Sequence, residues 1–105
     1  MPSTVDRALS DARSGRVLPL SWRVPDGRTI TVRATEEFTV SVQREHVTPA
    51  ETTALRQLAV ELIETDGTVQ PLHGYRTTSI TDELDLLHRW DDRRGLLLLT
   101  VTRPQ

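Results

Sequence analysis

Residues 17–44, VLPLSWRVPDGRTITVRATEEFTVSVQR, decide the fold that we predict for this chain. Apolar and polar side chains alternate through three successive runs, which is the period of two that a half-buried strand requires. Pro25-Asp26-Gly27 separates the first two runs and Thr35-Glu36-Glu37 the last two, and both tripeptides are typical of turns. The stretch predicts a three-stranded antiparallel meander with these inward positions: Leu18, Leu20, Trp22, Val24, Ile30, Val32, Ala34, Phe38, Val40 and Val42.

The clearest helical signal follows the meander, over residues 48–65. Thr48 supplies a helix N-cap, Pro49 suits the first helical position, and Glu51 completes a capping pattern three residues after the cap. Apolar residues then recur at helical spacing, at Leu55, Leu58, Ala59, Leu62 and Ile63. We expect this helix to lie across the apolar face of the sheet, because burial of that stripe is its main source of stability.

The C-terminal part of the chain predicts a second helix and a last strand. Ile80, Leu84 and Leu87 form a helical stripe over residues 80–92, and Gly95 follows as a natural stop. The continuous apolar run over 96–102 suits a strand covered on both faces, which places it centrally in the sheet. The stretch 68–79 stays open between a short strand and a loop.

A thin apolar stripe at the N-terminus predicts one further short helix. It begins after Ser3, which has an acid three residues later, and it ends before Gly15. Residues 1–4 and 103–105 are expected to fray. The predicted fold class is therefore α+β, in a single domain over residues 1–105. A mainly antiparallel sheet of four to five strands combines the N-terminal meander with a central C-terminal strand, and two principal helices pack on one face.

Composition narrows the class of protein. The chain has 105 residues, a net charge of −2 and no cysteine, so we expect a small soluble protein without disulfides or cysteine-bound zinc. No apolar run approaches the length of a membrane span, and we expect no membrane partner and a cytoplasmic location. All 13 basic residues are arginine. Codon usage in a GC-rich bacterial or phage genome is one interpretation of this lysine-free composition, and selection for arginine chemistry is the other.

The outward face of the meander is the first candidate site. Its side chains are serine, threonine and arginine, with Arg23 and Arg33 on the strands and Arg28 and Arg44 at strand ends nearby. Arginine among hydroxyls can bind phosphates or a polar protein surface. No aromatic side chain interleaves them, which disfavours the stacking surfaces that bind single-stranded nucleic acid. The competing interpretation is an ordinary solvated sheet face rich in arginine and threonine. The functional interpretation predicts that these four arginines bind a partner.

The segment TDELDLLHRWDD is the second candidate site. Asp85, His88 and Asp92 are three and four residues apart, so on a helix they share one face. Two carboxylates and an imidazole on one face could bind a divalent metal or act as general acid and base. The competing interpretation is a solvated polar helix face. No phosphate-binding glycine loop, nucleophile elbow or zinc-protease motif occurs, and no cofactor is predicted.

These features favour a non-catalytic protein-interaction or accessory, regulatory module. The arginine face and the acidic 80–92 helix carry opposite charges, so the partner is another protein or a second copy of this chain. One alternative is a nucleic-acid-associated regulator that uses the arginine face. Another is a small metal-dependent or acid–base enzyme centred on Asp85, His88 and Asp92. A winged-helix DNA-binding fold is disfavoured because its recognition helix would be acidic.

Overall fold

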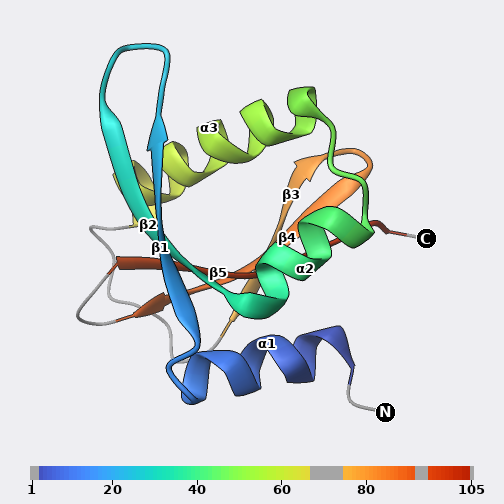
Figure 1. The fold of residues 1–105 in the computed structure, drawn as a ribbon. Coiled ribbons are helices and arrows are strands. Elements are labelled where there is room, and N and C mark those ends of the chain that lie inside the picture. The colour runs from blue at the N-terminus through green and yellow to red at the C-terminus, as the bar shows by residue number, and fades with distance from the viewer. Residues whose placement is uncertain (1–2, 67–74, 92–94, 105) are drawn as a thin grey trace.

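The computed structural model describes residues 3–66, 75–91 and 95–104. Within them the strands form one sheet and the helices pack around it (Figure 1). In chain order the elements are α1 (Thr4–Arg13), β1 (Val17–Arg23), β2 (Thr29–Thr35), α2 (Glu36–Arg44), α3 (Pro49–Asp66), β3 (Arg76–Thr81), β4 (Leu84–Asp91) and β5 (Gly95–Thr102). None of the helices in the described part combines the length and apolar character that a membrane span requires.

The five strands form one sheet in the order β1-β2-β5-β4-β3. The β1–β2 hairpin is antiparallel, β2 pairs with β5 in parallel, and β5, β4 and β3 pair antiparallel in turn. This arrangement confirms the predicted α+β class, the mainly antiparallel sheet and the central position of the C-terminal strand. Of the stretch left open at 68–79, residues 76–79 belong to β3, Tyr75 precedes it, and the rest lies outside the described residues.

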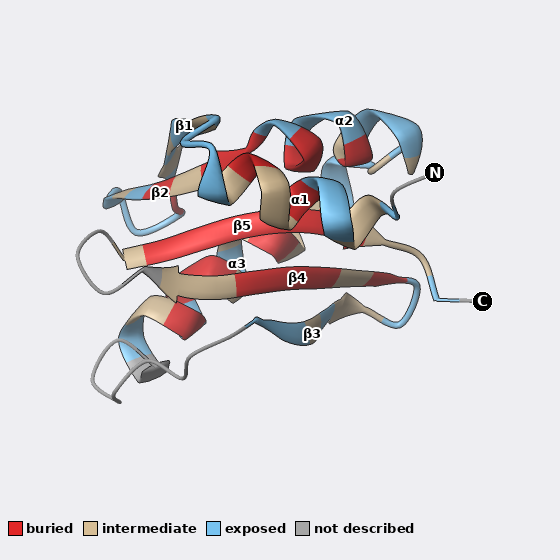
Figure 2. Ribbon diagram, turned by 90° about the horizontal axis from the view of Figure 1, so that it is seen from below, coloured by how far each residue is buried: buried red, intermediate tan, exposed pale blue. Residues whose placement is uncertain are grey.

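Helices cover both faces of the sheet (Figure 2). On one face α3 and the apolar side of α2 pack against Leu96, Leu98 and Val101 of β5. On the other face α1 packs against Leu97 and Leu99. The side chains of β5 thus enter two separate cores, which explains why its sequence is continuously apolar rather than alternating.

Two of the predicted helices are confirmed with their caps. In α1 the Ser3 hydroxyl accepts from the Asp6 N–H and the Asp6 carboxylate accepts from the Ser3 N–H. At the start of α3 the same exchange joins Thr48 and Glu51, over 3.0 and 3.1 Å. The N-terminal caps of α1 and α3 thus bond backbone N–H groups that an isolated helix leaves without partners. The capping patterns predicted from the sequence are therefore present in the folded chain.

The third predicted strand is wrong, because residues 36–44 form the helix α2. Thr35 is the N-cap, and its hydroxyl accepts from the Phe38 N–H over 3.1 Å. The residues that α2 buries are Glu37, Phe38 and Ser41, whereas Val40 is 45% exposed. The alternation of Phe38 and Val40 therefore does not describe the buried face. The tripeptide at 35–37 is a helix start, in which Glu36 and Glu37 favour the positive end of the helix dipole.

Where the pairing of β2 with β5 ends, residues at the start and within α2 bond the backbone of β5 instead. The parallel register covers only Arg33 opposite Leu97 and Ala34 opposite Leu98. Beyond it, the buried Thr35 hydroxyl donates to the Leu99 carbonyl over 2.6 Å. Six residues further along the chain, the Ser41 hydroxyl accepts from the Val101 N–H over 3.0 Å. The Thr35 and Ser41 hydroxyls thus bond backbone groups of β5 that a longer β2 would otherwise pair. Helix α2 places both hydroxyls within reach of β5.

The second predicted helix is also wrong, because residues 84–91 form β4. Leu84, Leu86 and Trp90 belong to the core beneath α3, and this spacing is the period of two typical of a strand. Leu87 belongs instead to the core beneath α1, next to a register irregularity between Leu87 and His88. Because β4 contributes to the cores on both faces of the sheet, apolar residues occupy even and odd positions, and Leu84 and Leu87 thereby acquire the helical spacing on which the prediction relied.

Arg103 was expected to fray, yet it is one of the most highly bonded side chains in the described residues. Its guanidinium bonds both carboxylate oxygens of Glu51, over 2.7 and 2.9 Å. It also donates to the Glu45 carbonyl over 2.7 and 2.9 Å and to the Glu83 carbonyl over 3.2 Å. The residue after β5 therefore joins the α2–α3 connection, the start of α3 and the β3–β4 turn.

Candidate functional site

One face of the β1–β2 hairpin carries two of the predicted arginines. The antiparallel register places Arg23 opposite Thr29, and Arg33 opposite Pro19. Arg33 is half-buried and the other residues of the set are exposed. We call this set the hairpin face, and its members are Pro19, Ser21, Arg23, Thr29, Thr31 and Arg33. The structure thus brings Arg23 and Arg33 to one surface, as the alternation predicted.

The other two predicted arginines are held elsewhere by carboxylates. Arg28 lies in the hairpin loop and pairs with Asp26 over 2.6 Å and with Glu64 of α3 over 2.9 Å. The hydrogen bonds that the Arg28 guanidinium donates, to Glu64 first and to Asp26 second, raise the pKa of Arg28. Arg44 lies at the end of α2, not on a strand, and pairs with the buried Glu37 over 3.0 Å, which raises its pKa. Neither guanidinium belongs to the hairpin face.

A pocket of about 410 Å³ lies between the hairpin loop and the first half of α3. We call it the hairpin–α3 pocket, and it is lined by Arg23, Val24, Pro25, Gly27, Thr53, Arg56 and Gln57. Its two charged residues are both arginines, and its lining includes no carboxylate. In the described part of the chain, neither Arg23 nor Arg56 forms an ion pair. The pocket is therefore positive on a chain of net charge −2.

Arg56 was not singled out by the sequence, where it stands beside Leu55 within the apolar stripe of α3. Its guanidinium carbon lies 6.0 Å from the centre of the Trp22 ring, over the ring face. An aromatic ring at this distance attracts a cation and limits the motion of the long side chain. The pair joins β1 to α3. No local signal in the sequence indicates it, because the two residues are 34 positions apart.

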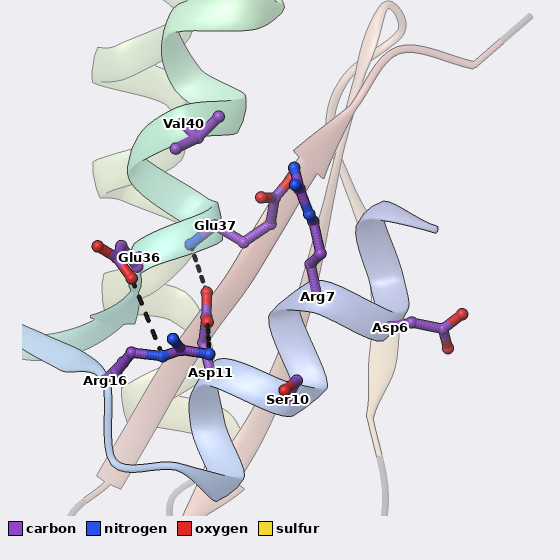
Figure 3. Close-up of a pocket in the computed structure, with 8 residues that line it drawn as sticks. All are labelled: Asp6, Arg7, Ser10, Asp11, Arg16, Glu36, Glu37 and Val40. Carbon is purple, nitrogen blue, oxygen red and sulfur yellow. Dashed lines mark hydrogen bonds and ion pairs between the residues drawn. The ribbon is translucent and has the colours of Figure 1, made fainter. Parts of the chain in front are cut away.

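A second cleft, of about 450 Å³, separates α1 from α2 (Figure 3). Its lining is mixed in charge: Asp6, Arg7, Ser10, Asp11, Arg16, Glu36, Glu37 and Val40. The buried Asp11 accepts from the Glu37 N–H over 2.9 Å and pairs with Arg16 over 3.1 Å. Because the Asp11 carboxylate of α1 accepts from a backbone N–H in the first turn of α2, this polar contact holds the two helices together.

The geometry predicted for Asp85, His88 and Asp92 is wrong, because β4 is a strand. Asp85 alternates with Leu84 and Leu86, so it lies on the face opposite the α3 core, whereas His88 is buried and its Nε2 is 2.9 Å from the Thr78 hydroxyl. Asp92 lies outside the described residues. Across those residues, no three acidic or histidine side chains form a group that could hold a metal ion. The acidic helix expected to complement the arginine face is likewise replaced by this strand.

Comparisons with protein-family models, with curated proteins and with solved structures find no match to this chain. The chain's own surfaces therefore remain to indicate its function. Of these, the hairpin face and the adjoining hairpin–α3 pocket share Arg23 and carry positive charge.

Proposed function

We propose that this chain is a non-catalytic protein-interaction module that docks an acidic surface of another protein on the hairpin face. One observation carries the proposal. The hairpin face holds two guanidinium groups and no carboxylate, although the whole chain has a net charge of −2. An acidic partner is attracted to this face and repelled by the acidic remainder, which orients the encounter. Such a module suits an accessory or regulatory subunit.

The distribution of charge favours a protein partner over a nucleic acid. Binding to a phosphate backbone needs several cations along one track, and sheets that bind single strands add aromatic platforms. The hairpin face has no aromatic side chain. The cations nearest to it in sequence, Arg16 and Arg28, are each paired with carboxylates. The positive charge is thus local, as expected for docking against a small acidic patch.

Fluorescence anisotropy with a labelled decapeptide of aspartate, glutamate and serine tests the proposal. The test variant is Arg23→Gln with Arg33→Gln. The control is Arg13→Gln with Arg76→Gln, which removes the same charge from exposed positions outside the hairpin face. A single-stranded oligonucleotide of equal charge is titrated in parallel, at about 50 mM and about 200 mM salt.

We expect the wild-type chain and the control to bind the peptide equally. The hairpin-face variant should bind about tenfold more weakly, because two charge pairs at a partly exposed surface are lost. Equal weakening in both variants would show non-specific attraction and contradict the proposal. Tighter binding of the oligonucleotide, falling steeply with salt, would replace the proposal with a nucleic-acid-associated regulator.

A further inference from the structure

We infer that the hairpin–α3 pocket binds a compact oxyanion, a carboxylate or phosphate group carried by the partner protein. The inference rests on the proposed function, because Arg23 belongs to both the pocket and the hairpin face. Guanidinium groups recognise both kinds of oxyanion through charge-assisted, often bidentate, hydrogen bonds. The pocket thus gives the docking surface an anchoring point for one anionic group.

The carboxylates near the pocket pair with Arg28, and neither Arg23 nor Arg56 pairs with a carboxylate of the described residues. Asp26 and Glu64 are held by Arg28, over 2.6 and 2.9 Å. A hydrogen bond from the Arg28 backbone N–H is the main cause that lowers the pKa of Asp26, so this carboxylate stays ionised beside its own partner. Elsewhere in the described residues, Arg16, Arg44 and Arg103 also have carboxylate partners. Arg23 and Arg56 differ from these arginines in having none.

Arg56 is arranged as a binding residue rather than as a solvated surface charge. The Trp22 ring holds its guanidinium at 6.0 Å, and the residue is half-buried. Its Nε is buried and donates to no acceptor among the described residues. A guanidinium with a buried donor that lacks an acceptor is destabilised, and the negative charge of an oxyanion bound at this side chain from the pocket would offset part of that cost. The same arrangement reduces the side-chain entropy lost when a ligand binds.

The opposite wall of the pocket is a fixed turn. The Asp26 carboxylate accepts from the Arg28 N–H over 3.0 Å, and the Gly27 N–H donates to the Val24 carbonyl over 2.9 Å. Gly27 has φ of 90°, a conformation that favours glycine. A turn closed by its own hydrogen bonds positions the pocket lining before any ligand arrives.

The size and charge of the pocket indicate one anionic group rather than a polymer. Its volume of about 410 Å³ lies at the lower end of the range for ligand pockets. The Arg56 guanidinium balances one carboxylate, and Arg23, which also lines the pocket, adds positive charge for a phosphate monoester, whereas a nucleic acid would need contacts that continue beyond the pocket. Gln57 adds an exposed amide that can donate to the same oxygen atoms.

Nuclear magnetic resonance of the full ¹⁵N-labelled chain tests this site with sodium phosphate and, separately, sodium acetate as the probes. Sodium chloride holds the ionic strength constant. The readouts are the arginine Nε–H signals and the backbone amides. The variants are Arg56→Gln, the charge-conserving Arg56→Lys, and the exposed control Arg76→Gln. The lysine variant removes the guanidinium fork but keeps the charge, so it also decides the question if Arg56→Gln does not fold.

We expect saturable shifts confined to residues 23–27 and 53–57, unchanged in Arg76→Gln and weakened about tenfold or more in Arg56→Gln. Arg56→Lys should bind with intermediate strength. Whichever probe binds more tightly identifies the source as phosphate or carboxylate. Shifts that do not saturate, that scatter over the surface, or that ignore both Arg56 variants would overturn the inference. Arg33→Gln separates the two proposals, because it should weaken docking of the acidic peptide while phosphate binding stays unchanged.

Discussion

Thr35→Val removes the hydroxyl that starts α2 while nearly preserving the shape of the side chain. In the native chain this fully buried hydroxyl accepts from the Phe38 N–H over 3.1 Å and donates to the Leu99 carbonyl over 2.6 Å. Leu99 lies at the register irregularity of β5, where it has no partner residue on β4. The substitution therefore removes a helix cap and one attachment of α2 to the sheet.

The expected cost follows from these two bonds. Loss of an N-cap costs about 0.5–2 kcal/mol, and a buried carbonyl that loses its donor costs about 1–3 kcal/mol. Together they predict that the free energy of unfolding falls by about 2–4 kcal/mol, from a total of roughly 5–15 kcal/mol for a domain. For a chain of this length the melting temperature should fall by roughly 10–18 °C.

Urea unfolding followed by circular dichroism measures this loss. The matched control is Thr35→Ser, which keeps both hydrogen bonds and loses only a methyl group. We expect the urea midpoint of Thr35→Val to fall well below that of Thr35→Ser, with the slope unchanged. Equal losses in the two variants would refute the reasoning, because the methyl contact rather than the hydroxyl would then attach α2.

Three further predictions concern contacts between elements that are distant in sequence. Hydrogen bonds from the Arg103 guanidinium first and the Thr48 backbone N–H second lower the pKa of Glu51 to about 2. The stability gained from this ionisation is therefore complete above about pH 4.5 and is lost as the pH falls towards 2. Arg103→Gln should raise the pKa of Glu51 and reduce this acid dependence, as a carboxyl titration by nuclear magnetic resonance would show. Asp11→Ala should cost about 1–2 kcal/mol in urea unfolding, since the Glu37 N–H loses its acceptor, and Asp11→Asn should cost less. Leu98→Ala should cost about 2–5 kcal/mol by the same assay, because this β5 residue is fully buried in the core beneath α3.

The sequence predicted elements well where local signals and tertiary packing agree. The Thr48 and Glu51 capping pattern marks the start of α3, and the unbroken apolar run 96–99 indicates a strand with two buried faces. Both signals depend on neighbouring residues only. The alternation in β1 and β2 likewise places Arg23 and Arg33 together on one face.

The two errors have a common physical origin, since local periodicity competes with contacts that are distant in sequence. In residues 36–44 the buried helix positions include the polar Glu37 and Ser41, so an apolar pattern does not reveal them. Ser41 is buried because it bonds the backbone of β5, 60 residues away. In residues 84–91 the strand is buried on both faces, so Leu87 enters the second core by ordinary alternation and the combined apolar pattern imitates helical spacing. The Trp22–Arg56 contact is also non-local, and for that reason Arg56 was missed.

Backbone-amide mapping of the wild-type chain with the unlabelled acidic decapeptide tests the central claim most directly. We expect saturable shifts on the hairpin face, at residues 21, 23, 29, 31 and 33, that continue into the hairpin–α3 pocket. Pro19 has no amide proton and gives no signal. Shifts centred instead on the α1–α2 cleft, or spread evenly over exposed arginines, would contradict it.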